Sequence, residues 1–296
     1  MKAAHIVGDR GAQATHMPVL LEEGLGFLQV RPGEKYIDAT VGEGGHSFEI
    51  AKRGGLVLGI DRDPRILAEA RRRMREGRVQ AQVKLVRGNF DRIDKLAEEN
   101  GFTKVGGVFF DLGVSSWQLE RSGRGFSFRG DEPLDMRVDP ALSVTAADLL
   151  NGLSRHELEK LLQKFGEEER AFQLASALVR ARSLKSFTTT LDLVRVVERV
   201  RRGRGRRHPA TKVFQALRIA VNDEIENLRS ALPRAFGILG GKGRLVVISF
   251  HSLEDREVKR FFRRSSKSHL GKILTERPVL PGRGEVAENP RSRSAK

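Results

Sequence analysis

The chain has 296 residues, of which 39% are apolar and 31% charged, a composition typical of a globular protein with one large core or one core plus a smaller domain. No apolar run approaches the roughly 20 residues that a membrane-spanning helix needs, and the start lacks the apolar stretch of a signal peptide, so we expect a cytoplasmic protein without membrane contact. The absence of cysteine excludes disulfides, thiolate metal sites and cysteine nucleophiles, and therefore also the covalent route to a pyrimidine ring carbon. The net charge of +16 favours a polyanionic partner such as nucleic acid, with a generally basic proteome as the simpler alternative.

The first half of the chain alternates apolar runs with charged stretches of helical periodicity. Strands are predicted at residues 36–38, 56–61, 83–86 and 105–111, and helices at residues 46–53 and 64–76. Pro64 stands near the first turn of the second helix, where its fixed φ is favourable. This order of strands and helices indicates an α/β fold, with a mostly parallel sheet and helices on both faces.

The pattern changes between residues 143 and 200, where no strand is predicted. Helices are expected at residues 154–162, with Ser154 as N-cap, and at residues 167–182 and 191–201. The α/β pattern resumes with a helix at residues 211–232, a strand at 243–249 and a helix at 254–264, whereas residues 277–296 are expected to be irregular. We therefore divide the chain into an α/β part at residues 1–138, an inserted helical domain at 139–209 and a second α/β part at 210–296.

A glycine-rich loop follows the first predicted strand. Residues 38–46 read Asp-Ala-Thr-Val-Gly-Glu-Gly-Gly-His, and glycines at this place allow a tight turn and close approach of a ligand to the backbone. Asp61 ends the next strand 19 residues after Gly42, a spacing that suits a carboxylate bonded to the ribose of a nucleotide-like cofactor. A plain turn between strand and helix is the alternative for the loop taken alone.

Two cofactors compete for such a loop. A dinucleotide loop follows the pattern G-x-G-x-x-G, whereas this chain has Ser47 at the sixth position. The carboxylate of Asp38 also suits the cationic amino acid part of S-adenosylmethionine better than it suits a diphosphate. The loop therefore favours S-adenosylmethionine.

The next two strands end in residues that would face the same crevice, because the carboxyl ends of parallel strands meet at one edge of the sheet. Phe90 follows the third strand and would either pack on an adenine ring or fill the core. Asp111 ends the fourth strand, where it would hold the cofactor or stabilise an acceptor amine as it becomes positive. Trp117, Phe126 and Phe128 follow, and would either sandwich a flipped base or form a hydrophobic cluster.

Two further motifs lie in the second half of the chain. Residues 199–212 carry seven Arg or Lys side chains and no acid, which favours contact with a phosphate backbone over a merely solvated face. Ser252 is the expected N-cap of the helix at residues 254–264, and His251 would either reach the site or act as a structural cap of the strand. We assign no metal ligands.

Motifs spread along the whole chain resemble those of the bacterial RsmH (MraW) family of ribosomal RNA small-subunit methyltransferases. The matching segments lie at residues 16–21, 38–47, 59–64, 111–116, 124–128, 133–137, 208–211, 214–219, 248–256 and 289–296. So many motifs in one order are not expected by chance. One departure is Trp117, because the family usually has Pro at that position.

The resemblance implies a Rossmann-like class I methyltransferase fold with an inserted helical domain that recognises the substrate. It implies transfer of a methyl group from S-adenosylmethionine to the exocyclic N4 of a cytidine in the decoding region of 16S ribosomal RNA, with the small subunit or its RNA as partner. By similarity, Asp61 would contact the ribose of the cofactor and Phe90 its adenine region. The remaining cofactor contacts implied are Gly44, Gly45, His46, Asp111 and Gln118.

For the mechanism we expect direct displacement of the methyl group by the amine, with Asp111 or a group in residues 112–116 drawing on the amine N–H. A DNA amino-methyltransferase is a rival, although its usual (Asp/Asn/Ser)-Pro-Pro-aromatic motif is here Asp111-Leu-Gly-Val. A non-catalytic RNA-binding assembly factor on the same fold is a rival from another class, and the glycine loop and Asp61 speak against it. The sequence leaves a homodimer open.

Overall fold

Five parallel strands form one sheet in the computed structural model, which describes residues 18–201 and 208–296. The strands are β1 (Lys35–Asp38), β2 (Leu56–Asp61), β3 (Val83–Arg87), β4 (Val105–Asp111) and β5 (Leu239–Ile248), in the spatial order β3-β2-β1-β4-β5. Every neighbouring pair is parallel. The predicted α/β, Rossmann-like fold class is confirmed.

The strand order reverses at β1. From β1 the chain adds β2 and β3 on one side, and then returns to add β4 and β5 on the other. The chain therefore turns away in opposite directions after the carboxyl ends of β1 and β4, and a crevice remains between these two strand ends. Open α/β sheets bind their ligands in such a crevice. Asp38 and Asp111 end these two strands.

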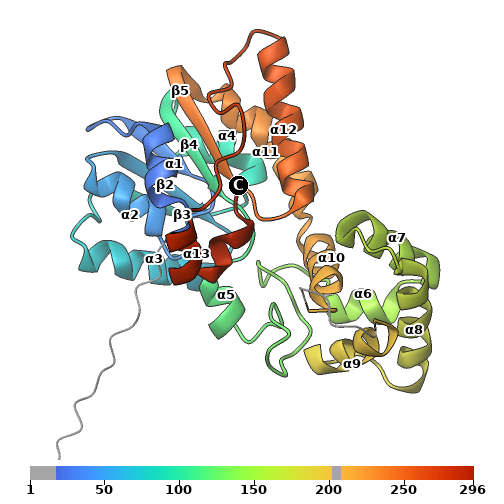
Figure 1. Ribbon diagram of the computed structural model, residues 1–296. Coiled ribbons are helices and arrows are strands. Elements are labelled where there is room, and N and C mark those ends of the chain that lie inside the picture. Colours follow the sequence, from blue (N-terminus) through green and yellow to red (C-terminus); the bar gives the residue numbers. More distant parts are fainter. Residues whose placement is uncertain (1–17, 202–207) are drawn as a thin grey trace, which may run out of the picture.

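Helices cover both faces of the sheet (Figure 1). One face packs on α4 (Ile93–Glu99), α11 (Glu224–Gly237) and α12 (Ser252–Lys267), and the other on α1 (Leu21–Leu28), α2 (Gly45–Lys52) and α3 (Pro64–Glu76). The alternation of side chains along β4 serves both faces, because Val108 and Phe110 join the first core and Phe109 joins the second. No helix in the described ranges is long and apolar enough to span a membrane.

A second, helical body stands beside the sheet (Figure 1). It contains α6 (Ala146–Gly152), α7 (Arg155–Gly166), α8 (Ala171–Leu184), α9 (Thr190–Val200) and α10 (Thr211–Asn222). Its apolar cluster runs from Phe126 to Val221, so residues on both sides of the predicted insertion at 139–209 contribute to it. The exact division at residues 138 and 209 stays a prediction.

The helix predicted at residues 211–232 is two helices. The chain breaks at Asp223, whose φ of 50° is left-handed, and α10 belongs to the helical body whereas α11 packs on the sheet. Asn222 holds the break, because its side chain accepts from Val138 N at 2.8 Å and donates to Met136 O at 2.7 Å. The apolar periodicity runs without interruption through both helices, so it did not show that α10 packs in the core of the helical body and α11 in that of the sheet.

Three other expectations are corrected. The helix expected from residue 167 begins at Ala171, because Glu167 adopts a left-handed conformation that ends α7. Residues 277–296 are not irregular throughout, since they contain α13 (Arg283–Glu288) and a 3₁₀ helix (Pro290–Ser294). The periodicity also passed over the short helices α1, α4, α5 (Ser116–Arg121) and α6.

Candidate active site

A pocket lies at the carboxyl edge of the sheet, at the reversal between β1 and β4. It is lined by the loop after β1, the ends of β2, β3 and β4, and the start of α12. Six of the seven predicted site residues line it, namely Gly45, His46, Asp61, Phe90, Asp111 and Gln118. The fold thus brings together residues that are separated by up to 73 positions in the chain.

Gly44, the seventh, lies behind the pocket lining as the N-cap of α2. Its φ is +83°, and a Cβ there would lie 2.6 Å from Met74 Cε and 3.3 Å from Ala70 Cβ of α3. Gly45 is constrained on the other side, since its Cβ would lie 2.4 Å from Pro18 Cγ. Both glycines are therefore needed for close packing of the loop, whatever the pocket holds.

Asp61 is aimed by the backbone around it. Its Oδ2 accepts from Gly42 N at 3.1 Å and its Oδ1 from Asp63 N at 2.9 Å, which ties the end of β2 to the glycine loop. Burial raises the pKa of Asp61 to about 6, against the opposing effect of these two hydrogen bonds. Each carboxylate oxygen retains a lone pair for a further donor, such as a ribose hydroxyl.

Phe90 meets both alternatives that the sequence left open. It opens the short 3₁₀ helix Phe90–Arg92 after β3, lines the pocket, and meets the buried ring of Phe110 edge-on, with the ring centroids 5.7 Å apart. The ring thus belongs to the pocket wall and to the core of one sheet face.

His46 and Asp111 face each other across the pocket floor. His46 Nε2 lies 3.1 Å from the Val19 carbonyl oxygen, so Nε2 carries the proton and donates to it. His46 Nδ1 then faces Asp111 Oδ2 at a distance of 3.6 Å, and the imidazole ring packs on Phe109. A neutral Nδ1 and a carboxylate are both acceptors, so this contact is favourable only when one of them holds a proton.

Asp111 is the most strongly perturbed of the pocket acids. Burial, then the charges of Asp38 and Glu254, raise its pKa well above the ordinary value. Its Oδ1 is buried and has no hydrogen-bond partner among the described residues. Asp38 lies behind it, with a pKa that burial raises to about 6 against the hydrogen bond from Ser47. A cationic or hydrogen-bond-donating ligand would satisfy this group of acids.

Gln118 shapes the loop after β4 as well as lining the pocket. Its Oε1 accepts from Ser115 N at 2.9 Å and its own N–H bonds to Ser115 Oγ, which forms a capping box at the start of α5. The family departure at Trp117 does not disturb this box. Trp117 N instead donates to Glu43 Oε1 of the glycine loop at 3.0 Å, a bond that Pro could not make.

The aromatic residues after α5 belong to the helical body. Phe126 is buried in its apolar cluster, and Phe128 packs against the same cluster while stacking on His208 at 4.3 Å. Neither residue lines the pocket, so the hydrophobic-cluster alternative describes them. Arg124 of the same motif is buried and pairs with Asp63 beyond β2, which joins the helical body to the end of the sheet.

The N-cap of α12 is His251 and not Ser252. His251 Nδ1 accepts from Glu254 N at 3.4 Å, whereas Ser252 is the first residue of the helix and donates from its hydroxyl to Glu167. The N-cap lies one residue earlier than expected because the imidazole of His251 reaches the free backbone N–H of Glu254, which a serine hydroxyl would otherwise cap. His251 nevertheless contacts Glu254, a pocket residue that the sequence analysis did not select.

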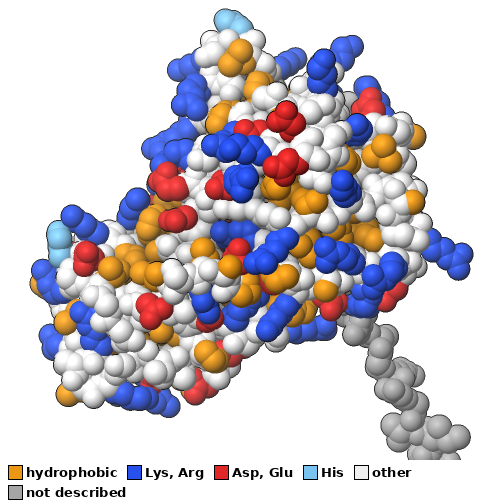
Figure 2. Space-filling model, turned by 180° about the vertical axis from the view of Figure 1, so that it is seen from behind, with side chains coloured by type: hydrophobic (Ala, Val, Ile, Leu, Met, Phe, Trp, Pro, Cys, Tyr) orange, Lys and Arg blue, Asp and Glu red, His pale blue; other side chains and the backbone are white. Residues whose placement is uncertain are grey.

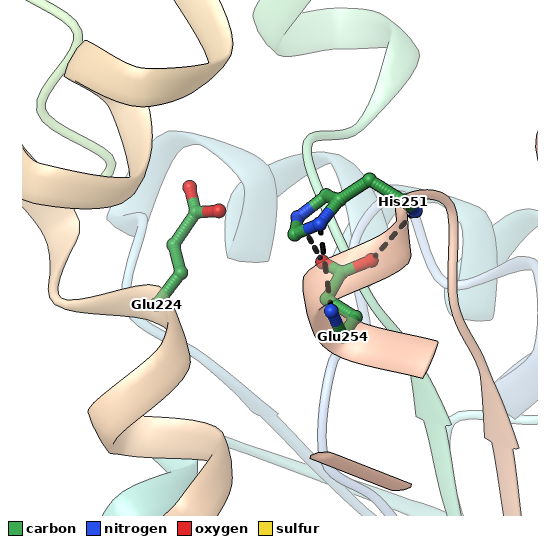
Figure 3. A group of neighbouring side chains, drawn as sticks. All are labelled: Glu224, His251 and Glu254. Carbon is green, nitrogen blue, oxygen red and sulfur yellow. Dashed lines mark hydrogen bonds and ion pairs between the residues drawn. The ribbon is translucent and has the colours of Figure 1, made fainter. Parts of the chain in front are cut away.

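Glu224 is a second pocket residue that was missed, and Figure 3 shows the His251 ring projecting toward it. One ligand atom from each of Glu224, His251 and Glu254 lies within 4.8 Å of the other two. Arg218, however, holds both oxygens of Glu224, with Nε at 2.8 Å and Nη2 at 2.9 Å. The charge of Glu224 is therefore already matched by a guanidinium, which disfavours a cation at this cluster. The capping-box pattern that ends at Glu254 is visible in the sequence and could have drawn attention to this residue. No local pattern in the sequence identifies Glu224 as a pocket residue.

On the face drawn in Figure 2, basic side chains are interspersed with acidic ones. In the predicted basic segment, residues 202–207 lie outside the described ranges. Arg201 pairs with the buried Glu168 at 3.0 Å and Lys212 donates to the Glu167 carbonyl at 2.7 Å, so these two cations are engaged within the fold.

The family model described as MraW methylase family matches residues 13–296. This chain belongs to the MraW methylase family. It is 46% identical to ribosomal RNA small subunit methyltransferase H of Thermomicrobium roseum, over 95% of this chain and 92% of the relative. It is 43% identical to the protein of the same name from Persephonella marina, over 95% of this chain and 97% of the relative. The resemblance inferred from the motifs is therefore confirmed.

Proposed function

We propose that this member of the MraW methylase family uses S-adenosylmethionine to methylate N4 of a cytidine in the decoding region of 16S ribosomal RNA. The observation that carries the proposal is the pocket at the strand reversal, which gathers Asp61, Phe90 and the half-buried carboxyl group of Asp111 around one space. The names of the relatives support small-subunit ribosomal RNA as the substrate class. Such a substrate implies a cytoplasmic place of action.

The pocket residues fit the proposed cofactor. The glycine turn at Gly42 brings the backbone close to the pocket, and Asp61 presents two oriented oxygens that suit ribose hydroxyls. The unpartnered Oδ1 of Asp111 and the raised pKa values of the buried acids suit a ligand that brings positive charge. When bound, the cofactor supplies a methyl group already activated on a positively charged sulfur. Gly45, His46 and Gln118 complete the proposed cofactor site, with Gly44 as the packing residue behind it.

The protein's task is then to position the two reactants and to manage charge. The chain contains no cysteine, so attack on a ring carbon through a thiolate intermediate is excluded, and direct attack by an exocyclic amine fits. Asp111 lies at the end of β4 where the charge of an attacking amine would develop. The target base would have to leave its stack to enter a pocket of this kind.

The test is incubation of small ribosomal subunits with labelled S-adenosylmethionine, followed by nucleoside analysis of the RNA. We expect the label in N4-methylated cytidine and, for Asp111→Ala, at least about a 100-fold loss of transfer, the size typical of a lost electrostatic contact in a site of this kind. Asp139→Asn serves as a control, because Asp139 pairs with Arg87 outside the pocket. Label in another nucleoside or in DNA only would overturn the specificity. Absence of cofactor binding in calorimetry would favour the non-catalytic assembly factor.

A further inference from the structure

The pocket has an acidic far wall that the proposed cofactor contacts leave unused. Glu254 and Glu224 line this wall together with Phe250 and Leu228. The wall is brought next to Asp111 by the pairing of β4 with β5, since Leu112 N donates to Ile248 O at 3.0 Å and residues 250–254 follow directly. Any acceptor placed near Asp111 therefore lies beside Glu254.

Glu254 is a buried carboxylate that the fold keeps ionised. Its side chain is 4% exposed, Oε2 accepts from Phe250 N at 2.8 Å, and Oε1 lies 3.2 Å from His251 Nε2. Burial acts to raise the pKa of Glu254, but the interactions with His251 and the charge of Arg218 outweigh it and hold this pKa below its ordinary value. Asp111 has the opposite shift, so the fold moves the pKa values of the two neighbouring acids apart, as in acid and base pairs of active sites.

Helix capping alone does not account for these features. Glu254 closes a capping box at the start of α12, and Glu157 and Asp148 close such boxes at the starts of α7 and α6. Glu157 and Asp148 are exposed and do not line this pocket, whereas Glu254 is buried and lines it. A cap gains nothing from burial of its charge, because burial makes ionisation costly.

The two acids of this wall differ in their partners. Arg218 pairs with both oxygens of Glu224, whereas Glu254 is held by His251 and by backbone N–H groups, with no Lys or Arg in ion-pair contact among the described residues. Glu254 is therefore the carboxylate of the wall that an arriving hydrogen-bond donor can engage. An amine that becomes positive as it attacks would be stabilised at this place.

We propose that Glu254 is the catalytic residue that accepts a hydrogen bond from the acceptor amine and takes its proton after methyl transfer. This inference rests on the proposed function. The amine nitrogen forms a bond to the methyl carbon while the methyl–sulfur bond breaks, with its electron pair remaining on sulfur. The nitrogen then carries a positive charge and releases one proton to Glu254, which later passes that proton to solvent. Arg218 and His251 are positioning residues for this carboxylate.

The decisive variant is Glu254→Gln, since Gln also closes a capping box and retains the shape of the side chain. We expect kcat for small subunits to fall about 100-fold or more, as for loss of a general base, while the Kd for S-adenosylmethionine stays within about threefold. The matched control is Glu157→Gln, which changes the same capping position of α7 outside the pocket and should leave kcat within about twofold. A kcat for Glu254→Gln within about threefold of the wild type would overturn the proposal.

A second measurement separates catalysis from structure. Glu254→Ala leaves space for a small carboxylate, so added formate should restore its rate at least about tenfold, and chloride at equal ionic strength should not. Equal rescue by chloride would overturn the proposal. Loss of wild-type activity in EDTA, with Mn²⁺ binding that Glu254→Gln abolishes, would also overturn it in favour of a metal site. Failure of the proposed function would be seen differently, because the wild-type protein itself would then produce no N4-methylated cytidine.

Discussion

At the scale of single residues, three carboxyl groups gather at the edge of the sheet where the pocket lies. Asp38, Asp61 and Asp111 end three neighbouring strands, and the loss of water makes ionisation of each one costly. The three carboxyl groups lie close together because the parallel sheet places all three strand ends at one edge. In a protein that binds a cationic cofactor, the positive charge of the ligand would stabilise their ionised forms and so stabilise the folded state.

The raised pKa values predict how stability depends on pH. Asp38 and Asp61 have a pKa of about 6 when folded, above their value in the unfolded chain. The folded state therefore holds these protons more tightly, and this contribution to stability is full below about pH 4 and is lost as pH rises through 6. Without cofactor, Asp38 and Asp61 together should lower the free energy of unfolding by about 1–3 kcal/mol between pH 5 and 7, and the raised pKa of Asp111 adds a decrease of the same sign.

Denaturant unfolding at several pH values measures this change. Asp61→Asn should remove about half of the part that Asp38 and Asp61 contribute, because an amide does not titrate. The acids with lowered pKa values, such as Asp192 at about 2, lose their contribution only in more acid solution and do not interfere in this window. An unfolding free energy that rises from pH 5 to 7 would contradict the assignment.

At the scale of elements, the start of α2 depends on a glycine in a left-handed conformation. At Gly44 an alanine would meet both a φ of +83° and Met74 Cε at 2.6 Å, whereas at Gly101 an alanine would meet a φ of +74° and no atom within 4 Å. Gly44→Ala should therefore destabilise the protein by about 2–4 kcal/mol, and Gly101→Ala by about 1 kcal/mol.

Denaturant unfolding of the two variants gives the difference between their free energies of unfolding. Because both variants carry the cost of a left-handed alanine, this difference reports the packing of the start of α2 on α3. The double change Gly44→Ala with Met74→Ala should recover the steric part of the difference, less the cost of the cavity. Equal destabilisation by Gly44→Ala and Gly101→Ala would show that the close approach of α3 has no energetic weight.

At the scale of the whole molecule, a sheet body and a helical body are held at a fixed relation beside the pocket. Arg124 pairs with Asp63, Asn222 bonds across the break between α10 and α11, and Arg256 bonds Glu167 at 2.6 Å. Buried or geometrically exact contacts of this kind are costly to break when one partner is removed. These contacts fix the position of the helical body relative to the pocket.

The net charge of +16 predicts strongly salt-dependent binding to small subunits. Changing Arg204, Arg206 and Arg207 of the basic segment to Gln should reduce the slope of log K against log salt concentration by about 2, which is roughly 0.7 for each lost contact. Changing Arg71, Arg72 and Arg75 on the surface of α3 removes the same charge and serves as the control. Filter binding at several salt concentrations measures both slopes, and equal slopes for the two triple variants would contradict a specific role of the segment.

The sequence alone was sufficient for the fold class, the strands and the residues at strand ends. Alternating apolar runs identify a parallel sheet, and in such a sheet the carboxyl ends share an edge, so Asp61, Phe90 and Asp111 were predicted to lie together because of their place in the pattern. Local signals also marked the starts of α2, α3, α7, α9 and α10 to within a residue. These features depend on neighbours within a few residues, which a sequence shows directly.

Only the tertiary structure decided which partner each element meets. The apolar periodicity of residues 211–232 would be the same for one helix packed in one core and for two helices packed in two cores. The break at Asp223 was therefore not predictable. Phe126 and Phe128 follow the pocket loop in sequence but pack in the helical body. Glu224 and Glu254 reach the pocket through contacts between distant segments, which the local sequence does not show.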